Sequence, residues 1–178
     1  MEQQAYTKGE SAMNRWIPAG WITAAAVLVI AILAPTGAAA KVKPKTVAFT
    51  ATYAGTANVQ VDGSVANISA NGTGKGTLLG SGSISGTGTG DSSQQPCVPF
   101  SGPGVMTGAA GTKLSFTVPT GAQGCGDEAG QVFSVVGHAT VTKGTGKLAN
   151  AHGTLRFTGT YDRGAGTFSV KFTGNLSQ

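Results

Sequence analysis

Few side chains in this sequence could carry acid–base or nucleophilic chemistry. Asp127 and Glu128 are the only adjacent carboxylates, and neighbouring acids in a loop are more often solvated charges than an acid and base pair. His138 falls on the opposite strand parity from Val135 and Val141, so its ring should point away from whatever these valines pack against. We therefore predict no catalytic residues and favour a protein that is not an enzyme.

Metal ligands are equally scarce. The sequence has two histidines, and the second, His152, lies in a glycine-rich loop where a loop-shaping or surface role is expected. Two histidines without paired carboxylates cannot supply the ligands of a typical protein metal site. We expect neither a metal ion nor a cofactor.

The two cysteines, Cys97 and Cys125, are predicted to form a disulfide. In an oxidising compartment an even pair in a small domain is most simply a crosslink. The closed loop of about 29 residues would stabilise the fold by roughly 3.5 kcal/mol. A catalytic thiol is the weaker interpretation because no histidine lies near either cysteine in the sequence, and a zinc site would need short paired spacings.

The elements that must position these side chains are β-strands, because large apolar and polar residues alternate along the chain. The alternation is clearest over residues 131–143, 154–161 and 167–176, with a shaped loop at 144–153. Aromatic residues occupy the inward parities of the predicted strands, and these are our candidate ligand-binding residues: Phe49, Tyr53, Phe116, Phe133, Phe157, Tyr161, Phe168 and Phe172. They could fill a small barrel as ordinary core, or line an apolar cavity whose polar point is a tyrosine hydroxyl.

The first half of the chain gives a weaker pattern. A strand is predicted from Thr46 until Gly55, followed by a hairpin around Asp62-Gly63. Residues 71–90 have the composition of a flexible linker. Their glycines share the even positions with Leu78 and Ile84, so we predict one or two glycine-rich strands instead.

The middle of the chain is expected to hold one short strand between two irregular segments. Leu114 to Val118 alternate clearly up to Pro119. Residues 91–111 contain three prolines and are predicted to be irregular, with Val98, Phe100 and Val105 folding inward from them. Residues 120–130 are predicted to form a turn-rich excursion, which the disulfide would hold near the same rim as the first segment.

About eight strands and no amphipathic helix predict an all-β fold for residues 46–178. An eight-stranded antiparallel β-barrel is favoured, with a β-sandwich as the alternative. Closure favours the barrel because it removes exposed strand edges.

The loop at 144–153 also carries a motif with a family resemblance. Its defining positions are Gly144, Gly146, Lys147, Leu148, Ala151 and Gly153. This pattern resembles the allene oxide cyclase and dirigent superfamily of β-barrels, as in small secreted actinobacterial barrel proteins of unknown function. Better-known members usually have Phe where this chain has Leu148. The resemblance implies an eight-stranded antiparallel barrel with a central cavity, but no activity, since one fold hosts many functions.

The N-terminal segment is typical of an export signal. Arg15 precedes an apolar run, Ile17–Leu33, and Ala38-Ala39-Ala40 then matches a signal-peptidase site. We predict cleavage after Ala40 and a secreted, extracellular bacterial protein. The alternative is a retained anchor, because the apolar run is near the lower length limit for a membrane span. The protein would then meet the membrane only through this leader.

These predictions divide the chain into three parts. Residues 1–40 are the signal peptide, in which the stretch before Met13 fits an upstream start that is not used. Residues 41–45 form a flexible basic lead, and residues 46–178 form the β-barrel domain.

The formal net charge of +5 comes without outward clusters of aromatic residues, which argues against nucleic-acid binding. We expect a protein that is not an enzyme and either binds an apolar or aromatic small molecule or serves as an envelope component. The alternative, from the resemblance, is a cyclase-like or dirigent-like protein that guides the stereochemistry of a reactive intermediate in the lumen. A homo-oligomer is left open by the sequence.

Overall fold

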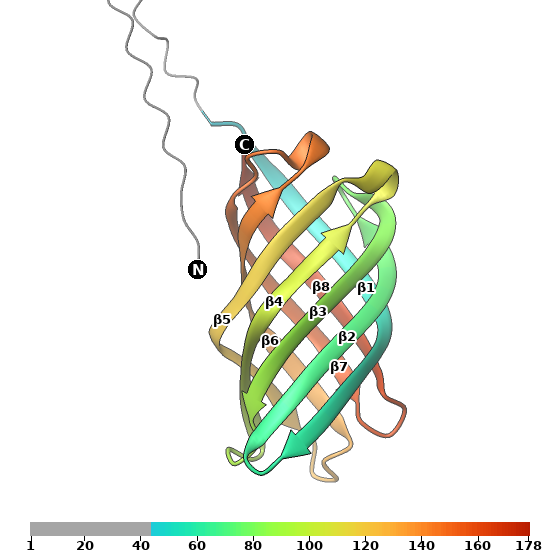
Figure 1. Cartoon of the computed structure of the whole chain (residues 1–178), viewed down its shortest axis with the longest axis vertical. Coiled ribbons are helices and arrows are strands. Elements are labelled where there is room, and N and C mark those ends of the chain that lie inside the picture. The colour runs from blue at the N-terminus through green and yellow to red at the C-terminus, as the bar shows by residue number, and fades with distance from the viewer. Residues whose placement is uncertain (1–43) are drawn as a thin grey trace, which may run out of the picture. The chain divides into compact units, whose positions relative to one another are not determined.

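Eight antiparallel strands follow one another around a closed barrel, in which β8 also pairs with β1 (Figure 1). The computed structural model describes residues 44–178. In chain order the elements are β1 (Thr46–Asp62), β2 (Val65–Gly76), β3 (Gly80–Asp91), β4 (Cys97–Thr107), the 3₁₀ turn η1 (Ala109–Gly111), β5 (Lys113–Gly126), β6 (Val132–Gly144), the 3₁₀ turn η2 (Gly146–Leu148), β7 (Gly153–Asp162) and β8 (Thr167–Ser177). The predicted barrel is confirmed and the sandwich alternative is excluded.

The predicted leader, its cleavage site and residues 41–43 of the basic lead lie outside the described residues. Pro44 and Lys45 are exposed, and Lys45 exchanges two backbone hydrogen bonds with Gln178, at N···O distances of 3.2 and 3.0 Å. Across residues 44–178, no helix is both long and apolar enough to cross a membrane.

The two ends of the barrel differ. One end, which we call the hairpin rim, carries the four short turns after β1, β3, β5 and β7. The other end, which we call the capped rim, carries η1, η2, the β2–β3 turn and the C-terminus (Figure 1). Because successive strands alternate in direction, the turns after β1, β3, β5 and β7 fall on one rim, and the connections after β2, β4 and β6 fall on the other.

The motif at 144–153 closes the capped rim. Leu148 is fully buried and Ala151 is 4% exposed, so this loop turns two apolar side chains into the end of the lumen. Gly144 has to be glycine, because a β-carbon there would overlap the carbonyl oxygen of Leu148. Gly146 adopts φ +58°, a backbone conformation that side chains other than glycine's rarely allow. The motif is thus explained by barrel closure.

The glycine-rich segment forms two strands, as predicted. β2 and β3 pair along their whole length, from Val65↔Asp91 to Gly76↔Gly80. Ile84 is buried, while the Ser and Thr side chains at the outward positions are mostly exposed.

Three predictions about irregular structure were wrong. Residues 97–107 form β4, β5 continues to Gly126, and β1 runs through Gly55 to Asp62 without a break. Two prolines fit inside β4 because neither Pro99 nor Pro103 has a ladder partner on β3. A proline is tolerated where its missing N–H is not needed. The predicted number of about eight strands was nevertheless right. Two predicted strands, the one that ends at Gly55 and the first arm of the hairpin at Asp62-Gly63, are together β1, and this extra strand compensated for the missing β4.

Candidate binding cavity

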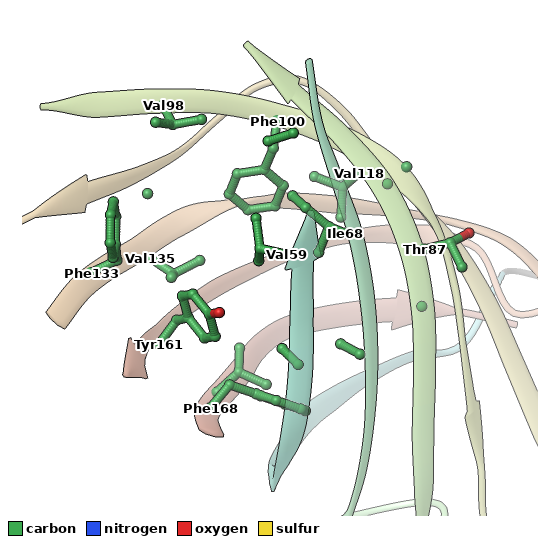
Figure 2. Close-up of a pocket in the computed structure, with 18 of the residues that line it drawn as sticks. Val59, Ile68, Thr87, Val98, Phe100, Val118, Phe133, Val135, Tyr161 and Phe168 are labelled. Atoms are coloured by element: carbon green, nitrogen blue, oxygen red, sulfur yellow. The ribbon is translucent and has the colours of Figure 1, made fainter. Parts of the chain in front are cut away.

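The half of the lumen next to the hairpin rim is hollow. It holds a cavity of about 490 Å³, bordered by residues from all eight strands. Figure 2 shows valine, isoleucine and aromatic side chains turned toward this space. The other half of the lumen is packed solid, and its largest fully buried side chains are Phe49, Tyr53, Met106, Leu114, Leu148, Leu155 and Leu176. Inward aromatic rings therefore fill the core in one half of the barrel and line an apolar cavity in the other half, and both of these arrangements were considered from the sequence.

Three packed phenylalanines form the floor of the cavity. The Phe172 ring lies 5.6 Å from those of Phe116 and Phe157, measured between centroids, with tilted planes. These spacings are in the favourable range for aromatic pairs. All three residues are at most 6% exposed, so the floor is closely packed.

Half-buried rings stand above this floor. Phe100 lies 6.2 Å from Phe157, and Phe133 lies 6.2 Å from Tyr161, between ring centroids. Together with Phe168, which is also half-buried, they face the cavity with surface that no other side chain covers. Apolar surface left open in this way is typical of small-molecule sites.

The structure separates the candidate ligand-binding residues into two groups. Six border the cavity: Phe116, Phe133, Phe157, Tyr161, Phe168 and Phe172. Phe49 and Tyr53 instead lie in the packed half, both 1% exposed. Strand parity indicates which side chains point inward but not how far along the barrel they lie.

Several lining residues were not among the candidates. Phe100 was expected to fold inward but was not proposed to bind a ligand, and Val59, Ile68, Val98 and Val135 also line the space. Val98 and Phe100 have the same strand parity, which indicates that both face the lumen. This parity was not used because residues 91–111 were predicted to be irregular.

Polar side chains are confined to the cavity mouth and to its wall. Ser92, Gln95 and Arg163 come from turns of the hairpin rim, and Tyr161 lies two residues from Arg163. The lining residues include no carboxylate and no histidine. The cavity therefore offers hydrogen bonds near its entrance and an apolar surface at its floor.

The other titratable candidates lie away from the cavity. His138 is exposed on the outer face of β6, as predicted, and His152 is exposed at the capped rim, where its backbone bridges to Ser177. Asp127 and Glu128 are exposed in the turn after β5, where an Asp127 carboxylate oxygen accepts the backbone N–H of Gln131 at 2.8 Å. In residues 44–178, no group of three or more metal-ligating side chains comes together.

Tyr53 is unusual because its hydroxyl is buried without a hydrogen-bond partner among the described residues. Burial raises the pKa of this phenol above its ordinary value, since the charged form would lose its hydration. The group does not border the cavity, so its environment concerns stability rather than ligand contact.

The predicted disulfide between Cys97 and Cys125 is confirmed. It joins the first residue of β4 to its directly paired position on β5. The neighbouring pair, Val98 and Gly124, lines the cavity, so the crosslink holds the wall beside the mouth.

No protein-family model matches this sequence, and no curated protein matches it. Among solved structures, the chain is similar to a pterocarpan synthase dirigent protein. The two share 12% sequence identity over 76% of this chain and 89% of that one, with a TM-score of 0.48. At this level the likeness concerns the fold alone, and the eight-stranded antiparallel barrel is established by its own strand pairing.

Proposed function

We propose that this protein binds an apolar small molecule with a flat ring in the hollow half of its barrel. The observation that carries the proposal is the aromatic cavity of about 490 Å³ beside the hairpin rim. This volume lies within the usual range of about 300–1,000 Å³ for ligand pockets. A barrel built only for rigidity gains nothing from the hollow, because unfilled apolar space costs stability.

The arrangement of rings supports a ring-shaped ligand. The floor rings are held against one another, whereas Phe133, Tyr161 and Phe168 are half-buried and present uncovered faces. A flat aromatic guest could stack against these faces with little loss of side-chain freedom, since its hosts are already positioned.

A binding role without catalysis also agrees with the lining chemistry. The cavity is bordered by one guanidinium, one phenol, an amide and a few hydroxyls, with no carboxylate or imidazole that could act as a general base. We also propose that the protein works outside the cytoplasm, because a disulfide is compatible with an oxidising compartment.

Two measurements test the binding proposal. Native mass spectrometry of the full chain purified from its own host should show a small molecule that is released on unfolding. Fluorescence titration with an uncharged naphthalene derivative should show saturable binding at one site. The proposal would be refuted if the purified protein carries no small molecule and also fails to bind any ring compound offered.

Gly124 offers a way to close the cavity without disturbing the barrel. A β-carbon at this position would touch only the Phe133 ring, at 3.9 Å, so a larger side chain would extend into the open space. Gly124→Val should abolish probe binding. Gln123→Val places the same residue one position along β5, on the exposed outer face, and should leave binding unchanged.

The second candidate is a dirigent-like or cyclase-like role, in which the lumen orients a reactive intermediate. What favours it is the open lumen with one tyrosine hydroxyl on its lining, that of Tyr161. Tyr161→Phe should then alter the ratio of stereoisomeric products, with Tyr53→Phe as a control outside the cavity. Identical product ratios with and without the protein, for each cyclisable substrate tried, would count against this role.

A further inference from the structure

The charges of the described residues are segregated along the barrel axis. All five side-chain carboxylates of the described residues lie at the hairpin rim, at the ends of β1, β3 and β7 or in the turn after β5: Asp62, Asp91, Asp127, Glu128 and Asp162. Five lysines lie near the capped rim: Lys45, Lys75, Lys113, Lys143 and Lys147. Arg156 and Lys171 lie within β7 and β8, and Arg163 is the base at the hairpin rim.

The cavity therefore opens at the acidic end of the molecule. Five carboxylates against one guanidinium leave four net negative charges around the mouth. Hydrogen bonds from the Ser93 hydroxyl and the Gln94 amide hold the pKa of Asp91 below its usual value. Carboxylates of this kind are ionised at neutral pH, so the field at the mouth is negative under ordinary conditions.

A charged group on a bound ligand has to stay in that field. The floor of Phe116, Phe157 and Phe172 offers no polar partner, and an unpaired charge buried there would cost far more than ring stacking returns. The charged group is thus confined to the mouth, beside Ser92, Gln95 and Arg163, and there it lies in the field of five rim carboxylates and this single guanidinium. The ring faces of Phe133 and Tyr161, which carry negative potential, also attract a cation rather than an anion.

We propose that the cavity takes neutral or cationic ring compounds and discriminates against anionic ones. This inference rests on the proposed binding function and adds the charge class of the ligand. Four net charges roughly 10 Å from a bound charged group should change its affinity by on the order of fivefold to tenfold in 10 mM salt. At 0.5 M salt the effect should shrink to within about twofold.

Three probes with the same naphthalene ring test the inference: 1-naphthalenemethanol, which is neutral, 1-naphthylmethylammonium, which is a cation, and 1-naphthaleneacetate, which is an anion. Each is titrated into the full chain at pH 7 in 10 mM and in 0.5 M salt. The expected order of affinity in 10 mM salt is cation, then neutral compound, then anion, with the differences largely lost in 0.5 M salt. Tightest binding of the anion, or an order that salt does not change, would overturn the inference alone. If none of the probes binds, the proposed function itself fails.

Charge variants locate the effect. Asp62 and Glu128 are exposed and, among the described residues, neither carboxylate accepts a hydrogen bond, so Asp62→Asn with Glu128→Gln should remove charge without removing turn contacts. This double variant should lower the ratio of cation to anion affinity at least twofold in 10 mM salt. Lys113→Gln with Lys143→Gln at the capped rim is the matched control and should leave the ratio unchanged. Equal effects of the two double variants would overturn the assignment of selectivity to the hairpin rim.

Discussion

Replacing Tyr53 by phenylalanine should make the protein more stable. The Tyr53 ring is 1% exposed, and its hydroxyl has no hydrogen-bond partner among the described residues. A buried polar group left unpaired costs about 1–3 kcal/mol, whereas the ring without its hydroxyl keeps its packing. We expect Tyr53→Phe to raise the free energy of unfolding by about 1–2 kcal/mol, which for a domain of this size corresponds to a rise in Tm of roughly 3–8 °C.

The assay is thermal and denaturant unfolding of the full chain at pH 7, with Tyr161→Phe as the matched control. The Tyr161 side chain is half-buried beside the open cavity, so its hydroxyl is not trapped in the packed core and the control should stay within about 0.5 kcal/mol of the wild type. A Tyr53→Phe protein less stable than the wild type by 1 kcal/mol or more would refute the reasoning, because it would mean that the hydroxyl is satisfied.

Three further predictions follow from the same structure. Burial raises the pKa of Tyr53 in the folded state, so above pH 10 the unfolded chain loses this proton while the folded chain retains it, and the free energy of unfolding should fall. The difference in free energy of unfolding between Tyr53→Phe and the wild type should therefore grow between pH 8 and pH 11 in denaturant titrations. Replacing both Cys97 and Cys125 by alanine opens a loop with a sequence separation of 28 and should cost about 3.5 kcal/mol in the same assay; a loss below about 1 kcal/mol would contradict the loop-entropy account. Leu148→Ala removes the fully buried plug of the capped rim and should cost about 2–5 kcal/mol, with exposed Lys147→Ala nearly neutral as its control.

The barrel could be predicted from the sequence because alternation with a period of two survives across most strands. Strand parity correctly placed Phe157 and Phe172 inside the barrel and His138 on its outer face. The glycine-rich strands could be recognised because their glycines shared a parity with Ile84. The capping loop was visible as a motif, although its purpose appears only when Leu148 is seen to be buried.

The position of the cavity could not be predicted for a physical reason. Parity fixes which face of the sheet a residue occupies, but the tilt and stagger of the strands decide which inward rings reach the same level of a barrel. Tyr53 and Tyr161 both point inward, yet one lies in the packed half and the other beside the cavity. The sequence did not predict β4 because prolines usually interrupt strands, whereas neither Pro99 nor Pro103 has a ladder partner on β3.

The most direct test of the account is methyl NMR of the full chain during titration with 1-naphthalenemethanol. If the ligand occupies the hollow half of the barrel, the methyl signals of Val59, Ile68 and Val135 should shift with saturation, whereas those of Leu148 and Leu176 at the capped rim should not. Shifts confined to the exposed Val136, on the outer face of β6, or no saturable shift at any methyl group, would contradict the claim that the lumen is a binding site.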